Sequence, residues 1–367
     1  MKRAMLITGA GGYLGSRLAK HYLELARQPV ILWLHAADEA ELERKAQALR
    51  KDLGGLAESA DVRGGDLRER EPFARVDPDE VETILHCAAV TRFNVEEALA
   101  REVNVEGSVK LYEFASRCEG LDRLALLSSV YACGLRSGAI EEAPIDEEPQ
   151  FANFYEWSKW ESERRLQRDF ASLPSMVLRT ATLIAESARG RVCQYNAFHN
   201  TLKLLFYGLV SLIPGDRDTP LYFVTADFAV DAVTRALERG KPGGVYHVCH
   251  AAGESMTLGG LIDTAYARFS LDADFHERRI LKPLFCDEAS FRMLVDGVAG
   301  FGGDVVRQGL ESVVPFAAQL FSHKSFANER LKSLLDVYAA PDATELVSNT
   351  CDHLIATRWG RRLDDAA

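Results

Sequence analysis

Short apolar runs alternate with longer amphipathic segments through the first half of the chain. The apolar runs predict buried strands, because a strand covered on both faces has few polar positions. The segments between them carry apolar residues at helical spacing and predict helices. The predicted strands are Ala4–Thr8, Val30–Leu34, Ala60–Gly64, Thr83–Cys87, Arg123–Ser128 and Ser175–Arg179. The predicted helices are Ser16–Arg27, Glu39–Leu53, Glu96–Arg117 and Ser158–Ser172.

This alternation of strands and helices predicts an α/β fold with a Rossmann-type, doubly wound parallel sheet. After about Leu183 the pattern changes and helices dominate. We predict a dinucleotide-binding domain over residues 1–183 and a smaller, mostly helical substrate-binding region over residues 184–367, with segments around 221–250 returning to the first domain. The later predicted elements are the helices Ala197–Tyr207, Phe228–Glu238 and Leu258–Phe269, the strand Gly243–His250, and a mostly helical stretch from Asp287 onward.

A glycine-rich turn, Thr8–Gly15 (TGAGGYLG), lies between the first predicted strand and the first predicted helix. A turn in this position is typical of a site for the pyrophosphate of a dinucleotide, which binds at the free N–H groups of the helix N-terminus. Gly9 permits the tight turn, Gly12 lets the backbone approach the phosphates, and Gly15 lets the helix pack closely. The alternative is an ordinary glycine-rich turn.

The composition of the chain limits the kinds of binding partner and the cellular compartment that we expect. The 367 residues carry a formal net charge of −11, so a long basic surface for nucleic acid is not expected. Seven cysteines are scattered without a CxxC pair, which predicts neither a metal site nor a disulfide framework and favours the reducing cytoplasm. No secretory leader pattern is seen at the N-terminus. The longest apolar stretch, Leu202–Pro214, is interrupted by Lys203 and is too short to span a bilayer.

Tyr155 and Lys159 are four residues apart at the start of a predicted helix, so their side chains lie on one face, one turn apart. An ammonium group beside a phenol favours the phenolate and lowers its pKa. Tyr155 is therefore expected to donate or accept a proton near neutral pH. An accidental pairing of the two residue types on a helix is the alternative.

With these motifs the chain resembles the extended branch of the short-chain dehydrogenase/reductase superfamily over essentially its whole length. Further motifs carry the resemblance: Gly65-Asp66-Leu67, the HCAA segment His86–Ala89, Asn104-Val105-Glu106-Gly107, and Leu127–Tyr131 at the end of a strand. The resemblance implies four catalytic residues, namely Ser129, Tyr155, Lys159 and Asn104. It also implies a nicotinamide dinucleotide bound by Thr8, Gly9, Gly11, Gly12, Tyr13, Leu14, Gly15, Arg17, His35, Asp66, Leu67, Cys87, Ala88, Ala89, Lys159 and Thr182.

In these roles Ser129 holds a substrate carbonyl oxygen, Tyr155 protonates it, and Lys159 binds the nicotinamide ribose. Asn104 supports a proton relay, and Asp66 contacts the adenine. Structural alternatives stay open for three of them. Asp66 and Ser129 are also suited to capping a loop or a strand end, and Asn104 to bonding within a helix.

We expect NADP as the cofactor, with NAD as the alternative. An acid at the end of the second strand would favour NAD, but the sequence there reads Leu34-His35-Ala36-Ala37-Asp38. His35 and Arg17 are candidates for binding the additional phosphate of NADP, and no acid is seen in a position to repel it. Both are also compatible with ordinary surface positions.

Three segments are similar to the male-sterility, thioester-reductase-like subgroup, which includes fatty acyl reductases and carrier-protein terminal reductases. They are His86–Asn94 (HCAAVTRFN), Arg179–Gly190 and Pro214–Ala232. The chain departs from the subgroup pattern at Thr180, Ala185-Glu186 and Arg189. The resemblance implies NADPH-dependent reduction of an acyl thioester, carried by coenzyme A or an acyl carrier protein, to an aldehyde or alcohol.

The substrate is expected to contact Phe93, Val130, Tyr131, Phe198 and Phe206, although the apolar helix that holds the last two is also suited to an ordinary core. Three other functions stay open. A ketone or alcohol oxidoreductase acting on a polyketide, lipid or sterol-like intermediate is the main alternative. A nucleotide-sugar epimerase or dehydratase and a redox-silent nucleotide-binding scaffold are the others. A homodimer is in keeping with the resemblance.

Overall fold

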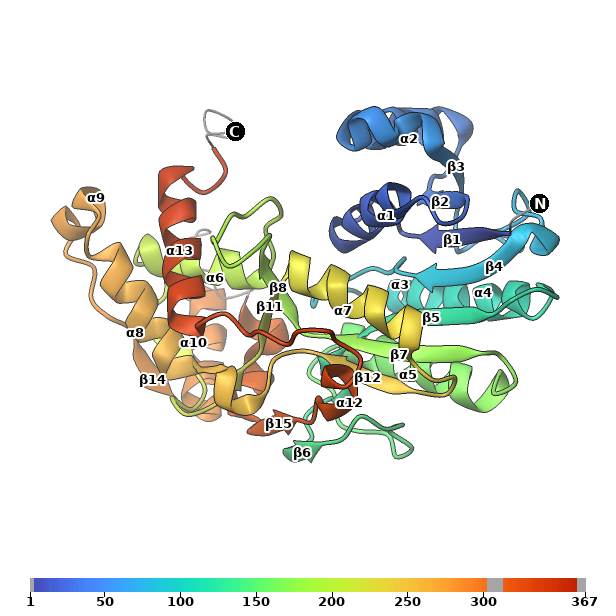
Figure 1. The fold of residues 1–367 in the computed structure, drawn as a ribbon. Coiled ribbons are helices and arrows are strands. Elements are labelled where there is room, and N and C mark those ends of the chain that lie inside the picture. Colours follow the sequence, from blue (N-terminus) through green and yellow to red (C-terminus); the bar gives the residue numbers. More distant parts are fainter. Residues whose placement is uncertain (1–2, 302–312, 362–367) are drawn as a thin grey trace.

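The computed structural model describes residues 3–301 and 313–361. Within these residues, seven parallel strands form one central sheet in the order β12-β7-β5-β4-β1-β2-β3 (Figure 1). The α/β fold with a doubly wound parallel sheet is therefore confirmed. The strands are β1 (Ala4–Thr8), β2 (Val30–His35), β3 (Ala60–Gly65), β4 (Val81–His86), β5 (Arg123–Ser129), β7 (Ser175–Thr180) and β12 (Val245–Val248).

Both faces of this sheet are covered by helices, because successive strand residues point to opposite sides. Met5 and Ile7 of β1 pack in one apolar cluster with α1, α2 and α7. Leu6, between them, packs in another cluster with α4 and α5. The helices are α1 (Tyr13–Leu25), α2 (Glu39–Leu53), α4 (Gly107–Ala115), α5 (Phe154–Asp169) and α7 (Ala226–Arg239).

Several helix boundaries differ from the sequence prediction. Helix α1 begins at Tyr13 rather than Ser16, and α5 begins at Phe154 rather than Ser158. The earlier start of α5 follows from its cap, since the Asn153 side chain accepts a hydrogen bond of 3.0 Å from the Glu156 amide.

The predicted helix Glu96–Arg117 is divided. A short helix α3 (Glu97–Leu99) leads into a π-helical stretch, Ala100–Glu106, before α4 begins. Five 3₁₀ turns also lie within the described residues, at Gly54–Ser59, Pro78–Glu80, Val130–Cys133, Ala252–Glu254 and Ala318–Phe321.

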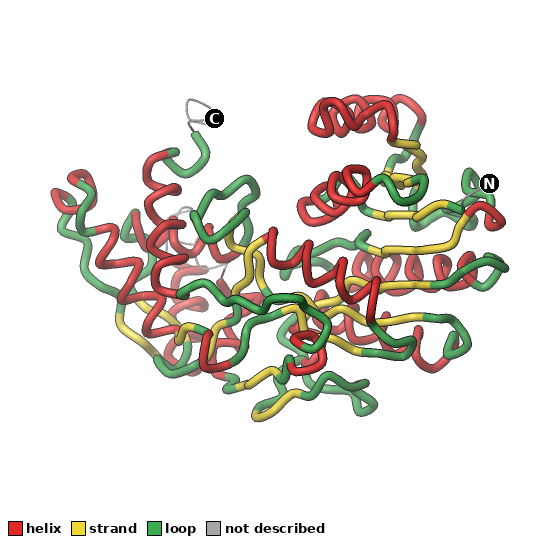
Figure 2. The backbone as a smooth tube through the Cα atoms, viewed as in Figure 1, coloured by secondary structure: helices red, strands yellow, loops and turns green. Residues whose placement is uncertain are grey.

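The second half of the chain builds a mostly helical region beside the carboxyl ends of the strands (Figure 2). Its apolar cluster joins α6, α8 and α13 and is separate from those of the central sheet. Its helices are α6 (Ala197–Phe206), α8 (Leu258–Phe269), α9 (Ala273–Glu277), α10 (Glu288–Phe301) and α13 (Ala343–Ala356). The short helix α12 (Glu329–Lys332) instead packs against β12 of the central sheet.

Four two-stranded pairs connect this region internally and to the sheet, and none was predicted as a pair. Strands of two to four residues show too little alternation to be recognised in a sequence. The pairs are β8 (Thr182–Ala185) with β11 (Phe223–Thr225), β9 (Leu212–Pro214) with β14 (Leu284–Cys286), β10 (Pro220–Leu221) with β13 (Met256–Thr257), and β6 (Gly138–Ile140) with β15 (Lys324–Phe326).

Residues 226–248 belong to the central sheet layer although they follow part of the helical region. Strand β12 pairs in parallel with β7 along Val245–Val248, and α7 packs beside α1. The chain thus crosses between the two parts more than once, and a cavity at their junction is lined by both.

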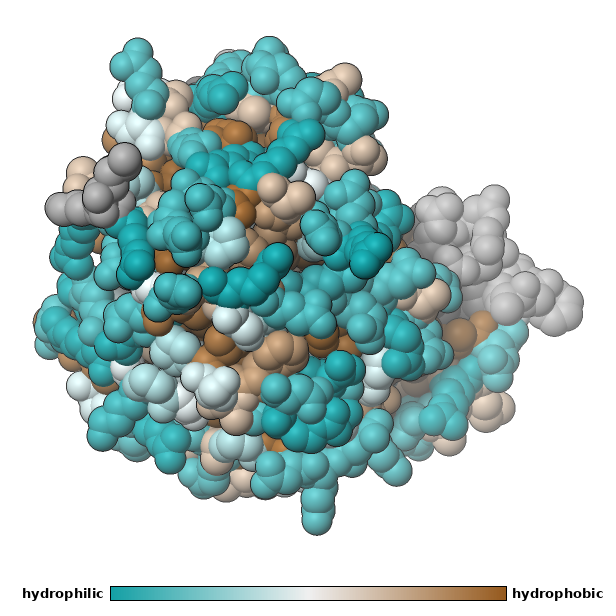
Figure 3. All heavy atoms as spheres, turned by 90° about the vertical axis from the view of Figure 1, so that its right-hand side faces the viewer, coloured by the Kyte–Doolittle hydropathy of each residue, from teal (hydrophilic) through white to brown (hydrophobic). Residues whose placement is uncertain are grey.

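The exposed face on the dinucleotide-fold side is mostly hydrophilic, with apolar residues scattered between the polar ones (Figure 3). Among the described residues, no helix combines the length and the apolar character that crossing a bilayer requires.

Candidate active site

A cavity of about 1350 Å³ begins at the glycine-rich turn and extends to α6 and α8 in the helical region. It opens at the carboxyl ends of β1, β4 and β5, where the strand order reverses between β1 and β4. This is where doubly wound folds bind their ligands. The cavity brings together most of the residues that the sequence singled out: Gly9, Gly11, Gly12, Tyr13, Leu14, Gly15, His35, Leu67, Cys87, Ala88, Ala89, Phe93, Ser129, Val130, Tyr131, Tyr155, Lys159, Thr182 and Phe198.

The glycine-rich turn has the geometry of a phosphate cradle. Gly9 adopts a φ of 69°, and a Cβ atom there would lie 2.7 Å from the Ala88 nitrogen. A Cβ atom on Gly15 would overlap the Gly9 carbonyl oxygen. At Gly15 the helix therefore packs closely against the glycine-rich turn and not against the strand. Gly12 caps α1 without a side-chain hydrogen bond, and the first turn of α1 holds no acidic residue. These features leave the helix N-terminus suited to an anion.

Thr8 lies behind the cradle and does not line the cavity. Its Oγ1 atom lies 2.7 Å from Nδ1 of His86 and accepts a hydrogen bond from the Ala88 amide. His86 also contacts the Ser108 hydroxyl at 3.0 Å. Burial lowers the pKa of His86 to about 3, so the ring is neutral at physiological pH. Thr8 and His86 therefore hold the ends of β1 and β4 together under the cofactor site.

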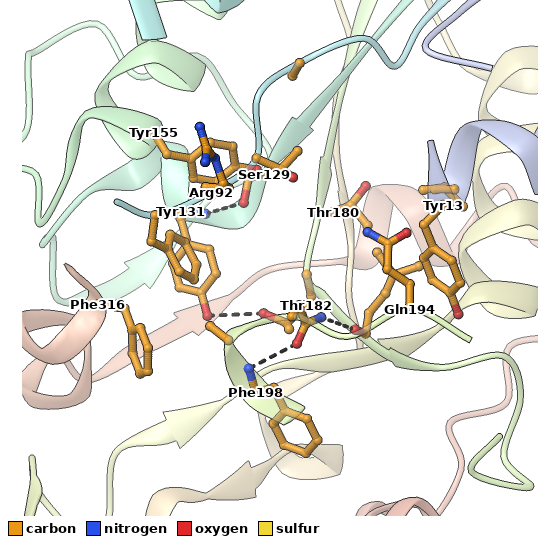
Figure 4. Close-up of a pocket in the computed structure, with 18 of the residues that line it drawn as sticks. Tyr13, Arg92, Ser129, Tyr131, Tyr155, Thr180, Thr182, Gln194, Phe198 and Phe316 are labelled. Atoms are coloured by element: carbon orange, nitrogen blue, oxygen red, sulfur yellow. Dashed lines mark hydrogen bonds between the residues drawn. The ribbon is translucent and has the colours of Figure 1, made fainter. Parts of the chain in front are cut away.

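Two adjacent serines end β5, and their side chains serve different partners. Ser128 donates to Glu163, which forms a buried ion pair with Arg179. Ser129 accepts a hydrogen bond of 3.2 Å from the Tyr131 amide (Figure 4). Its side chain also hydrogen-bonds Tyr155. Both serines line the cavity, and Ser129 is the one whose side chain contacts Tyr155.

Burial sets the protonation of the Tyr155–Lys159 pair. It raises the pKa of Tyr155 to about 12, and the hydrogen bond with Ser129 only partly opposes this. Burial also lowers the pKa of Lys159 to about 8, and Nζ donates a hydrogen bond of 3.0 Å to the Leu127 carbonyl. The expected lowering of the Tyr155 pKa by Lys159 is therefore wrong here. Loss of water around the phenolate raises the pKa of Tyr155, and the ammonium group of Lys159 is directed at a backbone oxygen instead of the phenol.

Asn104 lies behind the cavity wall, within the π-helical stretch. Its Oδ1 atom accepts from the Val90 amide at 2.8 Å, and Nδ2 donates to the Val90 carbonyl and to Ser158 Oγ, each at 2.9 Å. The side chain thus joins the loop after β4 to α5. Departures from α-helical geometry of this kind are frequent at functional sites.

Charged groups gather where β2 and β3 end. His35 is exposed, and its Nε2 atom lies 3.5 Å from the Asp66 carboxylate, which the sequence analysis did not place beside it. Arg68 pairs with Asp66 at 2.6 Å, and its hydrogen bonds lower the pKa of Asp66 to about 2. Lys45 donates to the His35 carbonyl at 2.8 Å. The expectation of no acid near His35 is therefore wrong, although Arg68 balances the charge. Lys45 and Arg68 line the cavity, whereas Asp66 does not.

Arg17 is occupied by another partner. Its guanidinium group forms an ion pair with Glu186 and lies 3.9 Å from the centre of the Tyr13 ring. Glu186 belongs to the loop after β8, so the pair joins the first helix to the helical region. Arg17 does not line the cavity.

Aromatic side chains form the wall beside Tyr155 (Figure 4). The Phe93 ring centre lies 5.6 Å from that of Tyr155, 5.5 Å from that of Tyr131 and 5.8 Å from that of Phe316. The Tyr131 hydroxyl contacts Thr182 Oγ1 at 3.3 Å.

Beyond this wall the cavity is lined mainly by aliphatic and aromatic residues, including Phe198, which packs on Phe223. Phe206 does not line it, because its ring packs into the core against Phe269, Phe275 and Trp359, and its assignment to the substrate site is wrong. The other apolar residues of this inner end include Leu202, Leu205, Ile213, Leu221, Leu258, Leu261, Ile262 and Leu320.

Several residues that line the cavity were not predicted from the sequence as site residues. Arg92 follows the HCAA segment and was part of a quoted motif, so its position offered a signal. Gln194, Phe316, Gln319 and Lys324 offered none, since they lie in loops or short elements that tertiary folding brings to the site. Among residues 3–301 and 313–361, no cluster of His, Cys, Asp and Glu is arranged to hold a metal ion.

The sheet order, the glycine cradle and the grouping of Ser129, Tyr155 and Lys159 define an extended short-chain dehydrogenase/reductase, an NAD(P)-dependent oxidoreductase. Residues 7–233, more than half of the chain, match the family model described as male sterility protein. The chain belongs to this family, in the thioester-reductase-like subgroup. No curated protein matches the chain.

Solved structures share the fold at low sequence identity. The terminal R domain from the myxalamid PKS-NRPS biosynthetic pathway is 18% identical, with a TM-score of 0.76, over 98% of this chain and 92% of that one. A thiolation-reductase di-domain from an archaeal non-ribosomal peptide synthetase is 17% identical, with a TM-score of 0.68, over 98% and 76%. UDP-glucuronic acid 4-epimerase from Bacillus cereus, in complex with NAD, is 17% identical, with a TM-score of 0.64, over 97% and 99%.

Proposed function

We propose that this protein is an NADPH-dependent reductase of acyl thioesters whose acyl group is aliphatic and is delivered by coenzyme A or an acyl carrier protein. The observation that carries the proposal is the apolar inner end of the cavity, which begins directly beside Tyr155. Leu202, Leu261 and Ile262 belong both to this lining and to the core of the helical region. An apolar chain gains free energy on entering such a space, at roughly 0.8 kcal/mol per buried methylene group.

A nucleotide sugar fits this end poorly. Its diphosphate and hydroxyl groups need charged and hydrogen-bonding partners, and leaving them unpaired in an apolar space is costly. Near Tyr155 the described lining holds the charged side chains of Arg92, Lys159 and Lys324. The ammonium groups of Lys159 and Lys324 are already bound, to the Leu127 carbonyl and to the Gly134 carbonyl and Gln319, which leaves few partners for a diphosphate. The epimerase alternative is therefore the weaker one. The names of two structural relatives, a terminal R domain and a thiolation-reductase di-domain, agree with carrier-bound substrates.

The cofactor site suits a nicotinamide dinucleotide. The cradle of Gly9 and Gly15 leaves no room for side chains, and the uncapped start of α1 offers backbone N–H groups to a pyrophosphate. Lys45 and Arg68 lie beside His35 at the adenosine end and carry positive charge suited to the additional phosphate of NADP, each with a carboxylate partner, Glu41 and Asp66. The bound cofactor supplies the hydride that the thioester carbon receives.

The chain's own residues would handle the oxygen and its proton. Ser129 and Tyr155 donate hydrogen bonds to the carbonyl oxygen, where negative charge develops. Tyr155, neutral because its pKa is about 12, gives its proton to that oxygen. The carbon–sulfur bond then breaks, and the oxygen's proton passes to the departing thiolate. The products are an aldehyde and a free thiol, and a second hydride and proton would give the alcohol.

Turnover of matched substrates tests this function. NADPH consumption is measured with a long-chain acyl-CoA, the same acyl group on an acyl carrier protein, and the corresponding 3-ketoacyl thioester. Conversion of UDP-glucuronic acid is followed separately by chromatography in the presence of NAD, because an epimerase consumes no cofactor overall. Formation of aldehyde and free thiol from the first two supports the proposal. Reduction of the 3-keto group alone, with the thioester intact, would instead establish the ketone reductase. Conversion of the sugar nucleotide alone would establish the epimerase.

A further inference from the structure

A segment from the C-terminal part of the chain, residues 313–326, closes one side of the cavity near Tyr155. Pro315, Phe316, Gln319 and Lys324 of this segment all line the cavity. Phe316 contacts Phe93, whose ring in turn contacts Tyr155. The wall that faces a reacting thioester is therefore built partly by residues more than 150 positions away from the catalytic tyrosine.

This segment is tied to the start of α5 and to the turn after β5. Asn153, the cap of α5, donates a hydrogen bond of 2.9 Å from Nδ2 to the Pro315 carbonyl. Gln319 donates to the Gly134 carbonyl at 3.2 Å. Lys324 donates to the same carbonyl and to Oε1 of Gln319.

Glu156, the residue after Tyr155, lies at the centre of these contacts. It is 0% exposed. Its carboxyl oxygens accept hydrogen bonds from the Ala152 amide at 3.0 Å and from Asn153 Nδ2 at 3.1 Å. The side chain of Gln319 also donates to it, and Lys324 attracts its negative charge. A carboxyl group buried beside a catalytic residue needs such compensation, because an unpaired charge there is strongly unfavourable.

All three hydrogen-bonding partners of Glu156 are donors. A carboxylate can accept from all of them, whereas a protonated carboxyl group or an amide must turn a donor of its own toward one of them. The charged form therefore holds the cap of α5 and the 313–326 segment together, and the neutral form holds them less tightly.

We propose that Glu156 is a positioning residue that fixes Tyr155 and the Phe316 wall relative to each other by tying the 313–326 segment to α5. The proposal rests on the reductase function, because it concerns the geometry in which Tyr155 meets the carbonyl oxygen. A misplacement of about 1 Å at a reacting group can cost a factor of about 100 in rate.

Simple capping of α5 is the competing interpretation. In that case only the bonds from Ala152 and Asn153 matter, and loss of the Gln319 contact has no effect on turnover. A variant on the far side of the tie, Gln319→Leu, distinguishes the two, because it leaves Ala152 and Asn153 unchanged.

The tie also predicts a pH dependence. Burial raises the pKa of Glu156 to about 7, although its hydrogen bonds and Lys324 oppose the rise. Burial lowers the pKa of Lys324. The other titratable groups coupled to this site are Cys133, Tyr131 and Tyr155, all with pKa values raised by burial. Because Glu156 loses its charge below about pH 7, kcat should rise as the pH increases through this value.

The kinetic test uses the full-length protein and acyl-CoA reduction with NADPH. Glu156→Gln and Gln319→Leu are compared with wild type and with Glu148→Gln, an exposed glutamate in the preceding loop. Both tie variants are expected to lower kcat about tenfold, with the KM for NADPH unchanged. Glu156→Gln should also abolish the rise of kcat near pH 7. Wild-type kcat and pH profile in both variants would overturn the proposal.

A second measurement needs no turnover. Amide hydrogen exchange of the cofactor-free protein is followed in peptides covering residues 133–135 and 315–326. Exchange should be faster in Glu156→Gln and Gln319→Leu than in wild type and Glu148→Gln. Unchanged exchange in both variants would overturn the positioning role of Glu156, whether or not the wild type reduces a thioester. A wild type that reduces no thioester would refute only the proposed function. Faster exchange with unchanged kcat and pH profile would reduce Glu156 to a structural residue.

Discussion

At the scale of single residues, the proton donor can be tested most directly. Tyr155→Phe removes the hydroxyl group and leaves the ring in place against Phe93. Because a positioned general acid contributes about 100- to 10,000-fold, kcat should fall by at least 100-fold while NADPH affinity stays near normal. Steady-state kinetics and fluorescence titration measure the two quantities. Tyr207→Phe, at a partly exposed ring, is the control. A Tyr155→Phe variant with most of its activity would refute the catalytic assignment.

The proposed preference for NADP rests on the charges around His35. A second carboxylate beside Asp66 would add negative charge that Arg68 alone does not neutralise. This charge would repel the phosphate on the adenosine ribose. His35→Asp is therefore expected to shift the ratio of kcat/KM for NADPH over NADH at least tenfold toward NADH, about 1.4 kcal/mol. Lys45→Gln should shift it in the same direction, since Lys45 donates to the His35 carbonyl. A constant ratio in both variants would show that this cluster does not select the cofactor.

Sequence motifs predicted the positions of most of these residues, but they did not predict the pKa values or the ion-pair partners of their side chains. Ser129, Tyr155 and Lys159 could be found because each occupies a fixed position at a strand end or helix start. The pKa of Tyr155 could not, since it depends on how completely folding removes water from the phenol. The partner of Arg17 is also a tertiary property, because Glu186 is 169 positions away.

At the scale of elements, the dinucleotide turn is the most sharply constrained. Gly15→Ala would place a methyl group against the Gly9 carbonyl oxygen and force the turn apart. We expect NADPH to bind at least tenfold more weakly and the free energy of unfolding to fall by about 1–3 kcal/mol. Titration calorimetry and urea denaturation measure the effects. Gly55→Ala is the matched control, because nothing lies within 4 Å of its Cβ position. Equal behaviour of the two variants would contradict the close approach.

Long helices and strands with a regular spacing of apolar residues were predicted more accurately than short or irregular ones. The helices Glu39–Leu53 and Leu258–Phe269 agree with the prediction at both ends, because each has a polar cap and a clear apolar face. The start of α5 was missed because Asn153 lies in a loop-like sequence. The 313–326 segment had no pattern that would assign it to the active site, since its role arises from packing against α5.

At the scale of the whole molecule, four buried histidines link stability to pH. Burial lowers the pKa of His86 and His247 to about 3, and that of His199 and His250 to about 4. These rings stay neutral in the folded protein, whereas in the unfolded chain they take up protons below about pH 6.5. The unfolded state thus binds more protons as the pH falls from about 6.5 toward 4, and the native state loses stability over that interval.

Glu156 acts in the opposite direction over part of this range. Its folded-state pKa of about 7 lies above the usual value of 4.5, so acidification from pH 7 to 4.5 stabilises the folded state through this group. One carboxyl group offsets about one of the four histidines. Asp66, with a pKa of about 2, adds a loss only below its ordinary value of 3.8.

The free energy of unfolding should therefore fall steeply between pH 6.5 and 5, with each histidine contributing at most about 1.4 kcal/mol per pH unit. Urea denaturation at several pH values measures this slope. His250→Leu should reduce the slope by the amount that corresponds to the uptake of about one proton on unfolding. The variant removes one titrating ring, whose Nε2 atom has no hydrogen-bond partner in the folded structure. A stability that is constant over this pH interval, or a slope that His250→Leu leaves unchanged, would show that these rings are not the groups that resist protonation in the native state.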